Sequence, residues 1–164
     1  MAKLLAIVAL LVVIVCGGYA KTINRGLCSG NSRNSIRPND PFGAGYYGAP
    51  RGSRRHKGVD ITCRAGATVY APFDGYIVRT SRPYSSGHEA INDGVLFKGT
   101  SGDFNNHYVF LWYVENYRVG ARLSQGARLG THMSMQSTYN GIGEHVHLQM
   151  EYPRGTVINP TSYL

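Results

Sequence analysis

Short runs of β-branched, aromatic and aliphatic residues alternate with turn-forming residues along the chain from residue 59 onward. Around Val146, Leu148 and Met150 apolar and polar positions alternate strictly, which is the period of a half-buried strand. No stretch shows the 3.6-residue period of an amphipathic helix. The pattern predicts a mainly β protein with an antiparallel β-sheet core. The runs that we expect to form strands are 59–62, 68–71, 75–80, 94–97, 108–113, 118–119 and 145–152.

The segment 29–55 differs from the rest of the chain. It is rich in asparagine, serine, proline, glycine and arginine, and its apolar residues follow neither a strand nor a helix period. We expect it to be a long loop. Neither an internal repeat nor a low-complexity linker divides residues 21–164, so the sequence predicts a single domain over that range.

Residues 1–20 have the organisation of a signal peptide. One lysine precedes an apolar run from Leu4 to Cys16, and small residues including Gly18 and Ala20 follow it. The run is shorter than the ~20 residues that a membrane-spanning helix needs, so a membrane anchor is the weaker alternative. We therefore expect a secreted, extracellular protein that begins near Lys21 and is not inserted in a membrane.

Removal of that leader leaves two cysteines, Cys28 and Cys63. An even pair in an oxidising compartment predicts a disulfide, and a mature protein without free thiols is expected to be a monomer. Two free buried thiols are the alternative. A zinc role for these cysteines is weaker still, because the chain has no Cys-x-x-Cys spacing.

The formal net charge of +8 favours anionic partners. Basic residues gather near His56, and the alternative for them is ordinary solubilising charge. Sulfated glycans or acidic receptor loops suit this charge, whereas nucleic acid is not an expected partner of a secreted chain without a nucleic-acid module. The basic residues near His56 are Arg51, Arg54, Arg55 and Lys57.

His56 and Asp60 lie four residues apart in a stretch whose β-branched residues disfavour a helix. An unbroken strand would hold them roughly 13 Å apart, too far to share a metal ion. A bend between them would bring them together, and Gly58 permits one.

His145 and His147 share one face of the strand expected over 145–152. One of these imidazoles can bind a metal while the other reaches a metal-bound water. Taken alone, the pair is more typical of hydrogen-bonded surface histidines than of a metal site.

Taken together, these motifs resemble the lysostaphin-type zinc endopeptidases, and the similarity extends from Leu27 to Leu164. Within that family the chain is most similar to a branch of secreted, cytokine-like vertebrate proteins. The motifs are, in order, His56-x-x-x-Asp60, the run 69–75, the run 126–130, and His145-Val146-His147.

The resemblance implies a zinc-binding site and a role for each of its residues. His56, Asp60 and His147 match the Zn²⁺ ligands, and His145 matches a histidine beside the metal that would be catalytic in an active enzyme. Val114 stands at the place of a second catalytic histidine, and its side chain can neither accept a proton nor stabilise an oxyanion. The resemblance therefore implies a zinc-binding but catalytically inactive domain.

The other three histidines, His88, His107 and His132, are expected to be half-exposed surface or loop residues. They are not expected to bind the metal.

Two functions remain open at this stage. The first is a secreted, cytokine-like and chemotactic signalling protein of the immune system on a catalytically degenerate peptidase fold, with a cell-surface receptor or a sulfated glycan as partner. The alternative is an active zinc metalloendopeptidase that cleaves the peptide cross-bridges of bacterial peptidoglycan. An inactive domain that still binds peptidoglycan or surface glycans lies between the two.

Overall fold

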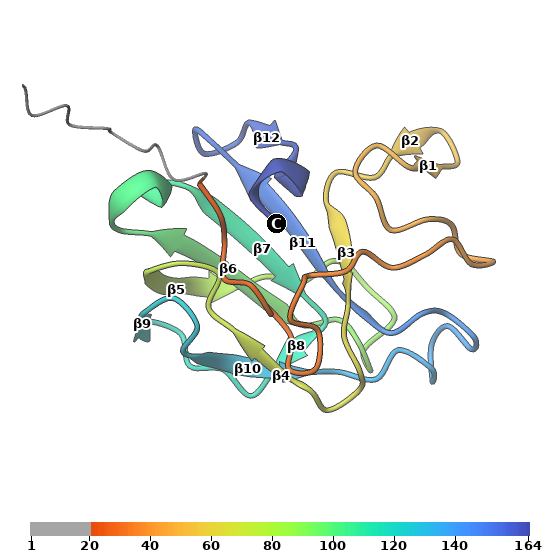
Figure 1. The fold of residues 1–164 in the computed structure, drawn as a ribbon. Coiled ribbons are helices and arrows are strands. Elements are labelled where there is room, and N and C mark those ends of the chain that lie inside the picture. Colours follow the sequence, from red (N-terminus) through yellow and green to blue (C-terminus); the bar gives the residue numbers. More distant parts are fainter. Residues whose placement is uncertain (1–20) are drawn as a thin grey trace, which may run out of the picture.

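The computed structural model describes residues 21–164, and its regular secondary structure is almost entirely antiparallel β-strand, joined by long loops (Figure 1). The signal peptide predicted over 1–20 lies outside the described residues. No helix in the described part is long and apolar enough to cross a membrane.

A seven-stranded sheet forms the centre of the molecule. In it β11 pairs with β7, β3 and β12, and the sheet continues through β6 and β5 to β9. Figure 1 shows β7 and β11 crossing the middle of the fold side by side. The strands are β3 (Val59–Thr62), β5 (Gly75–Thr80), β6 (Gly94–Gly99), β7 (Tyr108–Trp112), β9 (Arg122–Leu123), β11 (His145–Glu151) and β12 (Val157–Ile158).

A three-stranded sheet and a short hairpin complete the β-structure. The order in the small sheet is β4-β10-β8, and β1 pairs with β2 in the hairpin. Two short 3₁₀ helices, η1 (Gly102–Phe104) and η2 (Pro160–Tyr163), follow β6 and β12. The remaining strands are β1 (Pro50–Arg51), β2 (Arg54–Arg55), β4 (Thr68–Tyr70), β8 (Val114–Glu115) and β10 (Arg128–His132).

Both sheets contribute side chains to one main apolar core. Val146, Leu148 and Met150 of β11 are fully buried in it, as the alternation of the sequence predicts. A second, smaller cluster contains Ile91 and Met135 and packs beside the cleft described below.

The structure corrects the sequence-based expectation at several elements. The run 118–119 is not a strand, and β9 begins four residues after its start. The expected loop 29–55 contains the β1–β2 hairpin. The structure adds β10, which the sequence pattern does not predict because Gly130 interrupts its apolar run. A Cβ at Gly130 would lie 2.6 Å from the carbonyl oxygen of Glu115.

Two histidines expected at the surface are buried. His132 is 1% exposed at the end of β10, with Nε2 2.8 Å from the carbonyl oxygen of His145. His107 is 3% exposed, and its Nε2 accepts a hydrogen bond from the ammonium of Lys21 at 2.9 Å. Backbone carbonyls and Lys21 give these rings the polar partners that burial requires. His88 is exposed, as expected.

The predicted disulfide between Cys28 and Cys63 is present and buried, and it closes a separation of 35 residues. A Cys28→Ala/Cys63→Ala variant is expected to lose about 3–4 kcal/mol of unfolding free energy, because the open chain regains the entropy of that loop. Urea unfolding of both proteins at one pH measures the difference. An unchanged midpoint and slope would contradict a stabilising role for the bridge.

The buried histidines predict loss of stability in acid. Burial lowers the pKa of His107 and of His132 below the usual 6.5. Between those lowered values and about 6.5 the unfolded chain binds more protons than the folded one, so the free energy of unfolding falls as pH drops below about 6.5. Urea unfolding with a metal chelator present, from pH 7 downward, tests this. His107→Gln should flatten the decline and His88→Gln should not; equal slopes in both variants would contradict it.

Candidate metal centre

β11 provides the floor of the site. Its even-numbered residues point into the core, so His145, His147 and Gln149 share the opposite face. All three side chains line a cleft of about 600 Å³. Trp112 of β7 lies opposite His147 in the sheet, and its indole stacks on that imidazole at 4.6 Å between ring centroids.

The register between β3 and β11 places Asp60 beside His147. The two residues are direct cross-strand partners. Val59 and Ile61 alternate into the core, which leaves the carboxylate of Asp60 on the same face as the histidines. Asp60 Oδ1 lies 3.0 Å from His147 Nδ1.

The chain bends between His56 and Asp60, as the sequence required for these residues to meet. Gly58 is needed at the bend because the backbone passes very close to β11: a Cβ there would lie 2.3 Å from the carbonyl oxygen of Leu148. His56 Nε2 consequently lies 3.1 Å from Asp60 Oδ1. His56 Nδ1 donates to the carbonyl of Tyr46 at 2.9 Å, which fixes the orientation of the ring.

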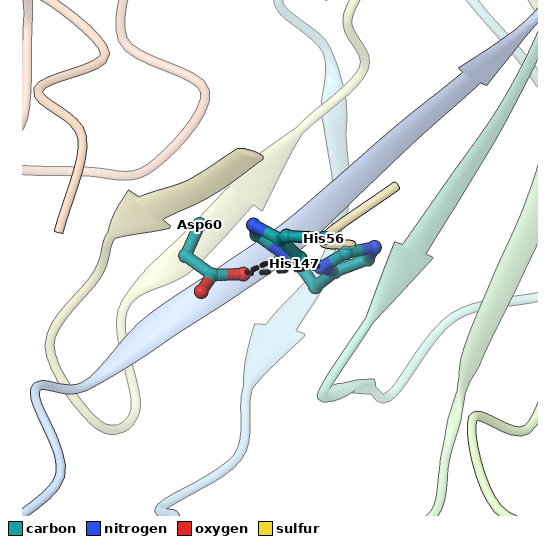
Figure 2. A group of neighbouring side chains, drawn as sticks. All are labelled: His56, Asp60 and His147. Atoms are coloured by element: carbon teal, nitrogen blue, oxygen red, sulfur yellow. Dashed lines mark hydrogen bonds and ion pairs between the residues drawn. The ribbon is translucent and has the colours of Figure 1, made fainter. Parts of the chain in front are cut away.

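His56, Asp60 and His147 therefore converge on one point (Figure 2). The third side of the triangle, from His56 Nε2 to His147 Nδ1, measures 3.0 Å. All three residues are buried. They come from β3, from β11 and from the bend before β3, so the sheet and one close backbone approach create the cluster.

The second carboxylate oxygen of Asp60 faces two guanidinium groups. Arg37 Nη2 donates to Oδ2 at 3.1 Å and Arg51 Nη2 at 3.3 Å. Arg37 is itself buried and also pairs with Asp40. These contacts hold the carboxylate in place and leave Oδ1 directed at the imidazoles.

The site favours an ionised Asp60 and neutral rings at His145 and His147. Burial alone would raise the pKa of Asp60, but contacts with His147 and His56 hold it well below its usual value. Burial lowers the pKa of His145 to about 4, although Asp60 acts in the opposite direction. Neutral imidazoles and a carboxylate are the protonation states that bind a metal cation.

His145 lies beside this triad rather than in it. Its Nε2 is 3.6 Å from Asp60 Oδ1, and its Nδ1 donates to the carbonyl of Gly143 at 2.6 Å. Its ring meets the ring of Tyr113 edge-on, with 5.4 Å between centroids. A tyrosine thus contacts this histidine within the cleft.

The placement of Val114 at a catalytic position is corrected by the structure. Val114 is fully buried in the main core and does not line the cleft, whereas Tyr113 does. Strict alternation from Trp112 would turn Val114 toward the site, but Tyr113 adopts a left-handed backbone conformation with φ of 68°. That conformation reverses the alternation, and sequence periodicity contains no signal for it.

Comparison with known proteins identifies the family. The model of the family described as Peptidase family M23 matches residues 54–160, which include the whole metal triad and His145. The chain belongs to peptidase family M23.

Within family M23 the chain is similar to relatives that carry a chemotaxin name. It is 37% identical to leukocyte cell-derived chemotaxin-2 of Mus musculus, over 84% of this chain and 85% of that protein. The Bos taurus protein of the same name has the same identity to this chain and the same coverage of both chains. Myeloid protein 1 of Gallus gallus is 40% identical over 75% of this chain, but the match covers only 37% of that protein.

Solved structures of M23 peptidases share the fold. The catalytic domain of lysostaphin from Staphylococcus simulans has a TM-score of 0.53 at 22% identity, over 72% of this chain and 86% of that one. A point mutant of the catalytic domain of the M23 protein EnpA from Enterococcus faecalis has a TM-score of 0.52 at 23% identity, over 72% and 87%. These similarities establish a lysostaphin-type M23 fold.

The M23 triad fits a zinc ion. Tetrahedral Zn²⁺ with bonds of about 2.0–2.1 Å holds its ligand atoms roughly 3.3–3.4 Å apart. The three sides of the triangle measure 3.0, 3.0 and 3.1 Å. Because His56 Nδ1 donates to the carbonyl of Tyr46, Nε2 is the ring nitrogen that can bind a metal. Two imidazoles and one carboxylate leave a fourth position open, as in catalytic rather than structural zinc sites.

We expect His147→Ala and Asp60→Asn each to weaken zinc binding by more than about 100-fold. Loss of a hydrogen bond to a ligand already costs about 10–100-fold, and these substitutions remove or weaken a ligand itself. Elemental analysis of dialysed protein, with circular dichroism to verify folding, measures the effect. The matched control is His88→Ala, an exposed histidine outside the triad. Full zinc content in folded His147→Ala protein would exclude this ligand set.

Proposed function

We propose that this chain is a secreted, zinc-binding M23 protein that acts as a cytokine-like, chemotactic signal through a cell-surface receptor rather than as a peptidase. Similarity to chemotaxin-2 of mouse and cattle over most of both chains supports a signalling role. The signal peptide expected over 1–20 and the Cys28–Cys63 disulfide support secretion.

The observation that carries the proposal is that Tyr113 contacts His145 within the cleft. Hydrolysis of a peptide bond benefits from two groups that exchange protons or stabilise the oxyanion. Among the described residues that line the cleft, the histidines are His56, His145 and His147, so His145 is the single imidazole beyond the proposed ligands. Burial raises the pKa of Tyr113 to about 12, and its hydroxyl is engaged with Tyr84 at 3.2 Å. A tyrosine in that state is a poor proton acceptor at neutral pH.

The triad itself favours a second candidate function. Zinc held by His56, Asp60 and His147 would act as a Lewis acid, which is the chemistry of an M23 peptidase. His145 Nε2, on the same face as His147, could then assist as a general base. A zinc endopeptidase that cleaves glycine-rich cross-bridges of peptidoglycan is therefore the alternative.

The wild-type protein is expected to hydrolyse pentaglycine no faster than its metal-free form. Loss of one acid–base partner costs about 10²–10⁴-fold, which removes most turnover without removing the metal. The measurement is release of amino groups from pentaglycine and clearing of Gram-positive cell walls. Zinc-dependent cleavage that His145→Ala abolishes would contradict the proposal and establish the peptidase.

Tyr113→His is the companion variant. It places a second imidazole opposite His145, so it should show more zinc-dependent hydrolysis than the wild type. Tyr113→Phe is the matched control, because it keeps the ring and adds no titratable group. Val114→His should show no gain, since that side chain is buried in the core.

A further inference from the structure

The cleft beside the metal triad has one basic wall. Arg51, Arg54 and Lys57, on and just after the β1–β2 hairpin, line it. Arg54 and Lys57 are exposed, and their side chains make no hydrogen bond or salt bridge to any residue in the range 21–164. Two cations therefore face the cleft without a counter-ion from the described chain.

The cleft has a strong excess of positive charge. Asp60 is the only carboxylate among the described residues that line it, and Arg37 and Arg51 already pair with Asp60. Arg54 and Lys57 are left over, and a bound divalent cation would add to their field. A concave surface concentrates such a field, so the cleft attracts anionic groups.

A second part of the lining, called here the other wall, is aromatic and apolar. Tyr113, Tyr84 and Tyr139 form a chain of hydroxyl contacts of 3.2 and 3.3 Å. Met135 and Ile142 line the cleft beside these rings. This wall offers ring faces and methyl groups to an apolar side chain, and its polar atoms largely satisfy one another.

The floor carries an amide without a partner in the described chain. Gln149 is only 9% exposed and lines the cleft on the face of β11 that holds His145 and His147. Its side chain makes no hydrogen bond to another described residue. Its amide atoms are open to the cleft, and a primary amide matches the adjacent N–H and C=O groups of a peptide backbone. The amide of Gln149 is therefore available to a ligand.

We propose that this cleft binds an acidic peptide segment of a partner protein. A glutamate or aspartate of the segment pairs with Arg54 and Lys57, an adjacent apolar side chain packs on Tyr84 and Tyr139, and Gln149 hydrogen-bonds its backbone. The volume of about 600 Å³ lies within the usual range of ligand sites. The inference rests on the proposed function, because it treats the occupant as a partner that is held and not cut.

A sulfated glycan fits these walls less well. Its charges are distributed around the whole chain and call for a broad basic surface, whereas only part of the lining of this cleft is basic and another part is aromatic and apolar. An acidic residue beside an apolar one matches the two walls together.

Trp112 provides the readout. It is the only tryptophan of the chain, and it stacks on His147 in the cleft. Its fluorescence is titrated in the zinc-loaded protein with the capped hexapeptide Gly-Gly-Glu-Phe-Gly-Gly and with the same peptide carrying Gln in place of Glu. The Glu peptide should bind about tenfold more tightly, and the difference should shrink as salt is raised.

Arg54→Gln/Lys57→Gln should remove this preference for Glu and leave zinc content unchanged. Arg25→Gln/Arg118→Gln is the charge-matched control, since both of its arginines are exposed and lie outside the cleft, and it should keep the preference. Gln149→Leu should weaken both peptides equally, because it removes a backbone contact.

Equal binding of the two peptides by the wild type would overturn the inference. A preference for Glu that survives in Arg54→Gln/Lys57→Gln would overturn it as well. A Trp112 response to a heparin-type oligosaccharide and to neither peptide would also overturn it, and would identify a glycan site. Cleavage of the peptides, measured in the same samples by chromatography, would overturn the proposed function while leaving the acidic specificity to be judged from the binding data.

Discussion

The antiparallel register between β3 and β11 is the constraint on which the site depends. It pairs Asp60 with His147, and the same strand brings His145 to the same face. A slip of one residue would turn the carboxylate into the core and an apolar side chain into the cleft. Burial of Val59 and Ile61 on one side and of Val146 and Leu148 on the other prevents that slip. The same strand pairing therefore places the apolar core on one face of the sheet and the metal triad on the other.

Two arginines offset the free-energy cost of burying the carboxylate of Asp60. A carboxylate as enclosed as that of Asp60 is costly unless charged partners surround it. Arg37 and Arg51 supply them, and both come from the segment 29–55, which has no regular period. The same segment carries Tyr46, whose carbonyl orients His56. The irregular N-terminal segment is therefore a structural part of the site and also builds the basic wall of the cleft.

The residue that meets His145 in the cleft is Tyr113, whose ring contacts that imidazole edge-on. Under the proposed function, proton transfer lacks a partner at this place while the triad keeps a donor set that suits zinc. The surrounding cations, tyrosines and the amide of Gln149 offer specific contacts to a ligand. Under that proposal the M23 fold serves recognition, and the metal triad is part of the recognition cleft.

Local pattern in the sequence determined the strands with a clear two-residue period, the pairing of Cys28 with Cys63, and the common face of His145 and His147. The strands and the common face of the two histidines depend on residues close together in the chain. The disulfide follows from the even number of cysteines that remain after residue 20. The tertiary structure decided the burial of His107 and His132, the pairing of Asp60 with two arginines, and the exchange of Val114 for Tyr113 at the cleft. These features arise from contacts between distant segments and from one left-handed residue, Tyr113, and the periodicity of a single chain contains information on neither.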